Sequence, residues 1–125
     1  MQARELVEHL LEWAVEKKAD NVKFYDLTGK TSYTDFIIIA EGGSDLHIRS
    51  IADNIVRKCK DNGIHINNKE GFKSSSWVLL DFVDVIVHVM TTETREFYKL
   101  DSLFTNIQQE IPEPIAADIE EEIDD

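Results

Sequence analysis

The pattern of apolar and polar positions divides the first forty residues into one helix and two strands. Over residues 3–18 the apolar side chains recur every three or four positions, which is the spacing of one face of an amphipathic helix. Residues 22–27 and 33–40 are rich in β-branched and aromatic side chains, which favour extended structure. Residues 36–40 are apolar on both faces, so we expect a central strand that is covered on both sides.

A second helix is predicted after a pair of glycines. Ser44 is a favourable N-cap residue, and Asp45 in the first turn suits the positive end of the helix dipole. Apolar residues then recur at helical spacing until Gly63 closes the helix. Residues 64–66 can form a third strand, and the order strand, helix, strand is typical of a crossover between parallel strands.

The second half of the chain contains two strand-like segments and a last helix. Residues 77–82 and 83–90 have strand patterns, and the periodicity leaves open whether a tight turn joins them or whether they form one long bent strand. Residues 94–104 are predicted to be helical, with three large apolar side chains aligned on one face. The sequence therefore predicts one α/β domain over residues 1–108, with helices packed on a mixed sheet of about five strands.

Acidic residues are concentrated at the end of the chain. The 125 residues have a net charge of −12, and eight of the 25 acidic residues lie from Glu110 onward, where no basic residue occurs. The remaining 17 acidic and 13 basic residues give the rest of the chain a net charge of −4. We expect residues 109–125 to be a disordered acidic tail. The body has no basic stripe of the kind that neutralises phosphates, so we expect little direct contact with nucleic acid.

The apolar runs, the cysteine and the histidines indicate which classes of protein to exclude. No run approaches the roughly 20 residues of a membrane-spanning helix, and the N-terminus lacks the apolar segment of a signal peptide. We therefore expect a cytosolic protein without membrane contact. The single cysteine, Cys59, falls on an apolar helix face and is interpreted as a buried structural thiol. None of the four histidines shows metal-ligand spacing, so neither a metal nor a cofactor is expected.

Two features resemble parts of enzymes, and each also has a structural explanation. The glycine-rich turn at residues 41–45 can hold an anion, but it lacks the lysine of a P-loop and Asp45 would repel a phosphate, so a plain helix-capping turn is the favoured interpretation. Asp81 and Asp84 follow in a strand region, as the metal-binding carboxylates of nucleotidyltransferases do. Residues three apart on a strand do not share a face, so this pair is poorly placed to hold a metal. A metal-dependent nucleotidyltransferase-like enzyme is the alternative function, although we expect no catalytic residue.

The segment that begins at Trp77 combines aromatic and aliphatic residues with isolated acids. This composition suits a packed edge of the core, and it equally suits an interface with an aromatic anchor. His88 shares a strand face with Ile86 and Met90, which favours a structural histidine, and a partner contact is also open. A third alternative is a general interaction domain that self-associates, as a homodimer for example, through the exposed sheet or the region of Trp13.

Six stretches of the sequence form an ordered pattern. They are Tyr-Thr-Asp-Phe-Ile-Ile-Ile-Ala at residues 33–40, Trp-Val-Leu-Leu-Asp-Phe-Val-Asp-Val-Ile-Val-His-Val-Met at 77–90, and shorter stretches at 44–45, 49–54, 70–71 and 95–100. Together they resemble the ribosomal silencing factors, also called the Iojap or RsfS family, over about residues 6–104. The resemblance implies a fold similar to a nucleotidyltransferase core without its catalytic carboxylates.

The resemblance also implies a function that needs no chemistry. A member of this family is expected to dock on the large ribosomal subunit, through large-subunit ribosomal protein fourteen, at the face where the small subunit joins. Docking there would block subunit joining and damp translation when nutrients are short, and a role in late assembly of the large subunit is also implied. Carried over by position, the partner-binding residues would be Trp77, Leu80, Asp81, Asp84 and His88, followed by Asp45, Arg49, Arg95 and Tyr98.

One position departs from the family pattern. Where the family reads Asp-x-Gly-Asp between two strands, this chain has Asp81-Phe82-Val83-Asp84. A glycine eases a special backbone angle that a β-branched valine resists. We therefore expect a more regular bend in this chain.

Overall fold

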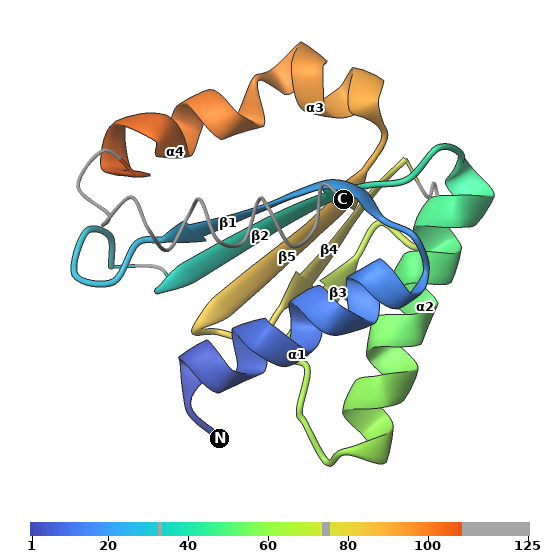
Figure 1. Cartoon of the computed structure of the whole chain (residues 1–125), viewed down its shortest axis with the longest axis horizontal. Helices are drawn as coiled ribbons and strands as arrows, with labels where there is room; N and C mark the ends of the chain where they lie inside the picture. The colour runs from blue at the N-terminus through green and yellow to red at the C-terminus, as the bar shows by residue number, and fades with distance from the viewer. Residues whose placement is uncertain (33, 74–75, 109–125) are drawn as a thin grey trace.

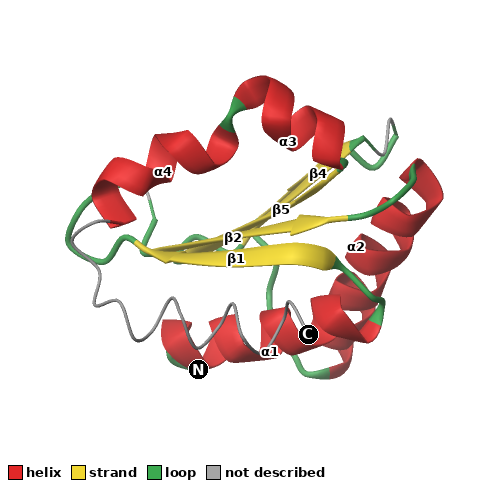
Figure 2. Cartoon of the chain, turned by 45° about the horizontal axis from the view of Figure 1, so that its top comes forward, coloured by secondary structure: helices red, strands yellow, loops and turns green. Residues whose placement is uncertain are grey.

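A mixed five-stranded sheet lies between two layers of helices (Figure 1). The computed structural model describes residues 1–32, 34–73 and 76–108, with the backbone alone for residues 105–108. One face of the sheet is covered by α1 (Ala3–Glu16) and α2 (Asp45–Asp61), while α3 (Thr92–Tyr98) and α4 (Leu100–Gln108) lie on the opposite side (Figure 2). The predicted α/β fold with a mixed sheet is confirmed.

The sheet has the spatial order β1-β2-β5-β4-β3. Its strands are β1 (Asp20–Asp26), β2 (Phe36–Glu41), β3 (Asn68–Glu70), β4 (Trp77–Asp81) and β5 (Val85–Met90). The central pair β2 and β5 is parallel, and the other three pairs are antiparallel. Every residue of β2 is buried, which confirms the prediction of a central strand covered on both sides.

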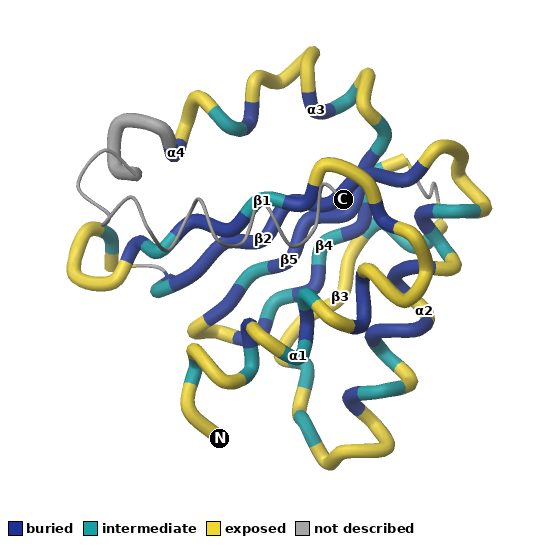
Figure 3. Tube along the Cα trace, viewed as in Figure 1, coloured by how far each residue is buried: buried dark blue, intermediate teal, exposed yellow. Residues whose placement is uncertain are grey.

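Alternation along the strands divides the buried side chains between two cores. Ile38 and Val87 point toward α1 and α2 and belong to the larger core. Ile37 and Met90 point the other way and pack with Leu100 of α4 in a smaller core. Figure 3 shows the buried positions concentrated in the central strands and along the inward sides of α1 and α2.

The predicted third strand at residues 64–66 is wrong. Ile64 and Ile66 pack against the larger core from a loop, which explains why their apolar pattern resembled a strand. The strand that does form is the exposed β3, which pairs antiparallel with β4 at the edge of the sheet. The predicted crossover therefore does not place the strand after α2 beside β2. The parallel partner of β2 is β5, which comes later in the chain.

The predicted last helix is broken into two. Lys99 adopts a positive φ of 50°, so α3 ends before it and α4 begins after it. The break turns Phe97 away from the face on which Leu100 and Phe104 are buried, and Phe97 is 78% exposed. The expected alignment of these three side chains is therefore wrong. The predicted acidic tail, and Tyr33 at the start of the predicted second strand, lie outside the described residues.

Cys59 is buried against the larger core, as predicted, and burial raises the pKa of its thiol to about 11. Such a thiol is protonated at neutral pH and packs as a small apolar side chain. Within the described ranges, no helix combines the length and the apolar character that crossing a bilayer requires.

Candidate functional site

Three of the predicted site residues come together where β4 begins. The indole Nε1 of Trp77 donates a hydrogen bond to Nδ1 of His88 at 3.0 Å. The ring of Tyr98, at the end of α3, lies 5.2 Å from the ring of Trp77, measured between centroids. Trp77 is half-buried and Tyr98 is exposed, so this group combines an anchored indole with accessible aromatic surface.

The burial of His88 explains how the indole is held. His88 is 8% exposed, and burial lowers its pKa to about 4. The ring is therefore neutral at physiological pH, and its Nδ1 accepts from Trp77, so the proton lies on Nε2. A neutral acceptor in a fixed strand sets the orientation of the Trp77 side chain.

Further apolar side chains extend this group over one face of the sheet. Leu79 follows Trp77 by two residues on β4 and pairs with His88, so it shares their face, as does Ile86 on β5. Both are partly exposed. Phe97, 78% exposed, stacks edge-on against Tyr98 at 4.9 Å between centroids. We call this surface the aromatic patch; it consists of Trp77, Leu79, Ile86, Phe97 and Tyr98.

A glycine fixes where β4 begins. Gly71 has a φ of 88°, and a side-chain carbon there would overlap the carbonyl oxygen of Trp77. Only glycine combines this angle with this close approach. The side chain of Arg49, on α2, donates to the carbonyl of Phe72 and lies over its ring. Both contacts hold the segment that leads into Trp77.

Three predicted partner-binding residues present almost no surface in this structure, and one of them is His88, described above. Leu80 is fully buried and points into the larger core, away from the face that carries Trp77. Arg95 is 7% exposed and is enclosed by ion pairs. The side chain of Leu80 is therefore out of a partner's reach in this structure, and Arg95 is accessible only through the cavity described below.

Of the remaining predicted residues, Asp81 reaches the edge of the aromatic patch, because it pairs with Ile86, and the others lie farther from it. Asp81 and Asp84 sit at the opposite end of β4, in the turn that joins it to β5, so the open alternative between a tight turn and one long bent strand resolves as the turn. Asp45 and Arg49 belong to the first turns of α2, on the other side of the sheet (Figure 2). The nine predicted positions therefore do not form one surface.

The turn between β4 and β5 is strained. Val83 has a φ of 75°, and the N–H of Asp84 donates to the carbonyl of Phe82 at 3.0 Å, which closes a three-residue turn around Val83. The carboxylate of Asp81 accepts from the N–H of Val83 at 2.7 Å and supports this geometry. The expectation of a regular bend is wrong, because the valine adopts the angle that suits a glycine. Such a residue costs about 1–3 kcal/mol.

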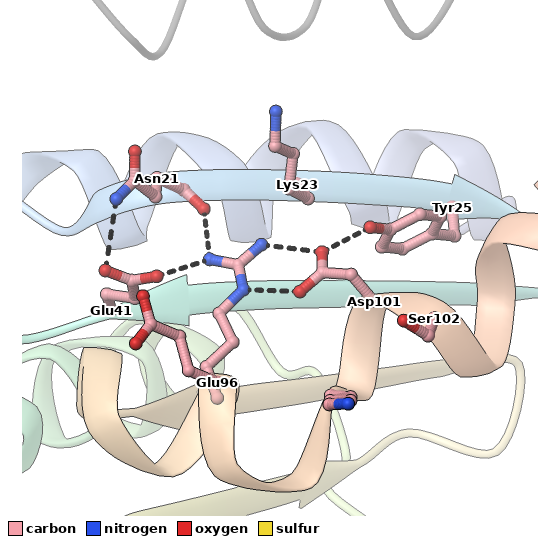
Figure 4. Close-up of a pocket in the computed structure, with 9 residues that line it drawn as sticks. Asn21, Lys23, Tyr25, Glu41, Glu96, Asp101 and Ser102 are labelled. Carbon is pink, nitrogen blue, oxygen red and sulfur yellow. Dashed lines mark hydrogen bonds and ion pairs between the residues drawn. The ribbon is translucent and has the colours of Figure 1, made fainter.

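Arg95 ties the C-terminal helices to the sheet (Figure 4). Its guanidinium donates twice to Asp101, at 2.7 and 2.9 Å, once to Glu41 at 2.9 Å, and once to the carbonyl of Asn21 at 2.6 Å. The hydroxyl of Tyr25 donates to the same carboxylate. Burial alone would raise the pKa of Asp101, but the hydrogen bonds from Arg95 and Tyr25 outweigh it and hold that pKa below its usual value. These contacts cross the helix break at Lys99 and fix α3 where it places Tyr98.

A cavity of about 580 Å³ lies over this ion-pair network (Figure 4). Lys23 of β1 and Glu96, Lys99 and Ser102 of the C-terminal helices complete its lining. The charges of the lining residues balance, with three cations and three carboxylates, so the cavity favours no ligand charge. The sequence analysis considered Glu41 only as part of the turn at residues 41–45, and it did not single out Asn21 or Asp101, because their spacing along the chain carries no motif.

The carboxylates of the hairpin are placed differently from those of a metal site. Asp81 is engaged with the main chain of its own turn, and Asp84 is exposed beside it. Over residues 1–32, 34–73 and 76–108, no three His, Cys, Asp or Glu side chains gather in a way that could hold a metal ion.

Comparison with known proteins identifies the family. The family described as "Ribosomal silencing factor during starvation" matches residues 1–125. Ribosomal silencing factor RsfS of Haemophilus influenzae is 35% identical over 99 residues, which are 79% of this chain and 97% of that protein. A mouse protein named "Mitochondrial assembly of ribosomal large subunit protein 1" is 28% identical over 96 residues, 72% of this chain and 41% of its own length.

A solved structure agrees with the sequence comparison. The crystal structure of a protein from Chromobacterium violaceum superposes with a TM-score of 0.81 and 30% sequence identity, and the match covers 84% of this chain and 88% of that one. The fold, the family match over the whole sequence and the named relatives lead to one conclusion. This chain belongs to the ribosomal silencing factor family.

Proposed function

We propose that this protein represses translation in the cytoplasm by docking on the large ribosomal subunit and excluding the small one. The proposed docking surface is the aromatic patch, and the proposed partner is large-subunit ribosomal protein fourteen. Family membership supports the ribosome as target, and the mouse relative is named for assembly of the large subunit. The action is a competition for a surface and requires no catalytic group.

The observation that carries this proposal is the anchored indole of Trp77. His88 holds its Nε1 and the tilted ring of Tyr98 packs against its ring, so the side chain is ordered before any partner arrives. Pre-organisation lowers the entropy lost on binding. A tryptophan in such a position typically contributes about 2–4 kcal/mol to an interface as a hot spot.

Electrostatics supports a basic protein as the partner. The chain before Glu110 has a net charge of −4, and the hairpin that continues from the patch carries the partly exposed Asp81 and the exposed Asp84. Opposite charge on a partner accelerates encounter and fixes its orientation. The two carboxylates are therefore proposed as flanking contacts and the aromatic patch as the centre.

Sedimentation with purified large subunits tests the proposal. We expect the wild-type protein to sediment with the large subunit and Trp77→Ala to remain in the supernatant, with unchanged circular dichroism. Val15→Ala, an exposed apolar position on α1 away from the patch, is the control and should bind like wild type. Normal sedimentation of Trp77→Ala would remove the aromatic patch from the proposal. Sedimentation velocity of the free protein then tells whether the same surface serves self-association instead.

A further inference from the structure

A groove with local positive charge lies between the C-terminal end of α1 and the outer side of α2. Its volume is about 280 Å³. The lining contains three cationic side chains and a single carboxylate. The residues that line it are Lys17, Leu46, Arg49, Ser50, Asp53, Asn54 and Arg57.

A buried asparagine builds one end of this groove. Asn54 is 3% exposed, and its amide nitrogen donates to the carbonyl of Trp13 at 2.8 Å and to the carboxylate of Glu16 at 3.0 Å. Its oxygen accepts from the guanidinium of Arg57 at 2.7 Å. Arg57 is thus oriented by a neutral group, which leaves its positive charge uncompensated.

A histidine builds the other end. Nδ1 of His47 accepts from the N–H of Gly43 at 2.9 Å, so the proton lies on Nε2, which donates to the carbonyl of Lys17 at 2.7 Å. This bridge fixes the backbone of Lys17 beside the first turn of α2. The amide of Asn54 therefore orients the guanidinium of Arg57 within α2, while the His47 bridge positions the main chain of Lys17.

The charge of the groove is opposite to that of the body around it. Among the described residues, neither Lys17 nor Arg57 forms an ion pair, whereas the neighbouring Glu16 pairs with Lys58 at 3.8 Å. The lining carries three positive charges and one negative charge in a chain whose residues before Glu110 sum to −4. Net charge alone concealed this cluster, since it averages over all faces.

We propose that this groove, which lies on the opposite side of the sheet from the aromatic patch, binds the phosphate backbone of ribosomal RNA as a second contact that rests on the proposed function. Its volume of about 280 Å³ lies just below the roughly 300–1,000 Å³ of cavities that hold drug-sized ligands, and its cationic lining matches the charge of a phosphodiester. Lys and Arg side chains with hydroxyl and amide neighbours are the groups that position phosphates. An acidic protein segment is the competing occupant.

Fluorescence anisotropy with a short fluorescein-labelled RNA hairpin tests this groove without the ribosome. We expect Lys17→Glu and Arg57→Gln each to weaken RNA binding about 3- to 10-fold and to lower the slope of log affinity against log salt by about 1. Asp53→Asn should strengthen binding, because it removes the one carboxylate of the lining. Lys69→Glu, a charge reversal at an exposed lysine of β3, is the matched control.

The same variants are then sedimented with large subunits at two salt concentrations. The proposal is supported if Lys17→Glu binds more weakly than Lys69→Glu and its binding depends less on salt concentration. Equal effects of the two reversals on RNA binding, or displacement of the RNA by a polyglutamate peptide at equal concentration, overturn it. The RNA-binding assay does not involve docking on the ribosome, so its result is independent of the aromatic patch. An error in the proposed docking surface would instead be seen as normal sedimentation of Trp77→Ala with large subunits. Thermal melting shows whether each variant is folded, and Arg57→Gln provides a second, milder test of the groove if Lys17→Glu does not fold.

Discussion

Arg95 and Asp101 lie on opposite sides of the helix break at Lys99 and form a two-point ion pair, with N–O distances of 2.7 and 2.9 Å. The pair sets the angle between α3 and α4, and its guanidinium is anchored to the sheet through Glu41. Because α3 carries Tyr98, this internal network determines how the proposed docking surface is assembled. If the proposed docking surface is correct, Arg95 contributes to it by positioning α3.

Replacing Arg95 by lysine tests this structural role. Lysine cannot reproduce the fork that reaches Asp101 and Glu41 together, and Glu41 is 5% exposed. We expect Arg95→Lys to lower the free energy of unfolding by about 3 kcal/mol. Urea unfolding measures this change. Arg4→Lys, at an exposed ion pair with Asp26, is the matched control and should cost less than about 0.5 kcal/mol; equal losses would show that Arg95 is not a special anchor.

Val83→Gly is expected to stabilise the protein. The φ of 75° at Val83 is unfavourable for a β-branched residue but not for glycine. Val83 is 56% exposed, so its replacement removes little packing. We predict a gain of about 1 kcal/mol by thermal or urea unfolding. Val15→Gly, inside α1, should have the opposite sign, a loss of about 0.5–1 kcal/mol. Destabilisation by Val83→Gly would mean that the turn is not strained.

The lowered pKa of the buried His88 should make the free energy of unfolding depend on pH. Burial lowers its pKa to about 4 in the folded protein, while the unfolded chain has an ordinary value near 6.5. Between these values the unfolded state binds a proton that the folded state does not, so stability falls as the pH is lowered from about 6.5 to about 4. The expected loss is about 2–3 kcal/mol over this window.

The comparison of wild type with His88→Gln isolates this contribution. The variant should show a shallower decline of unfolding free energy over the same pH range. His9→Gln, on α1, provides a control for the removal of any histidine. If the unfolding free energy of His88→Gln falls with pH as steeply as that of the wild type, the pH dependence arises from other groups.

The helices α1 and α2 and the central strand β2 were predictable from the sequence, because the spacing of apolar residues and the N-cap residue of α2 indicate them directly. The side chain of Ser44 caps α2 as expected, accepting from the N–H of His47 at 3.0 Å. The exposed β3 has no apolar pattern, and its pairing with β4 is a tertiary contact that periodicity cannot report. The positive φ at Lys99 likewise has no signal in the residue type.

The candidate site was predictable only in part, for a related reason. An aromatic anchor beside a strand histidine pointed to Trp77 and His88, which the structure joins. Leu80 and Arg95 look identical in the sequence to residues that could face outward, and only the alternation of β4 and the ion pairs of the C-terminal helices reveal that they are buried. The groove of Lys17 and Arg57 depends on two helices that lie far apart in sequence.

Light scattering of subunit joining measures the central claim most directly. Purified small and large subunits are mixed at magnesium concentrations that favour joining, with increasing amounts of this protein. The proposed function predicts that the wild-type protein abolishes the joining signal and that added large subunits relieve the inhibition, whereas Trp77→Ala inhibits little at the same concentrations. Full joining in the presence of saturating wild-type protein, or equal inhibition by Trp77→Ala, would contradict it.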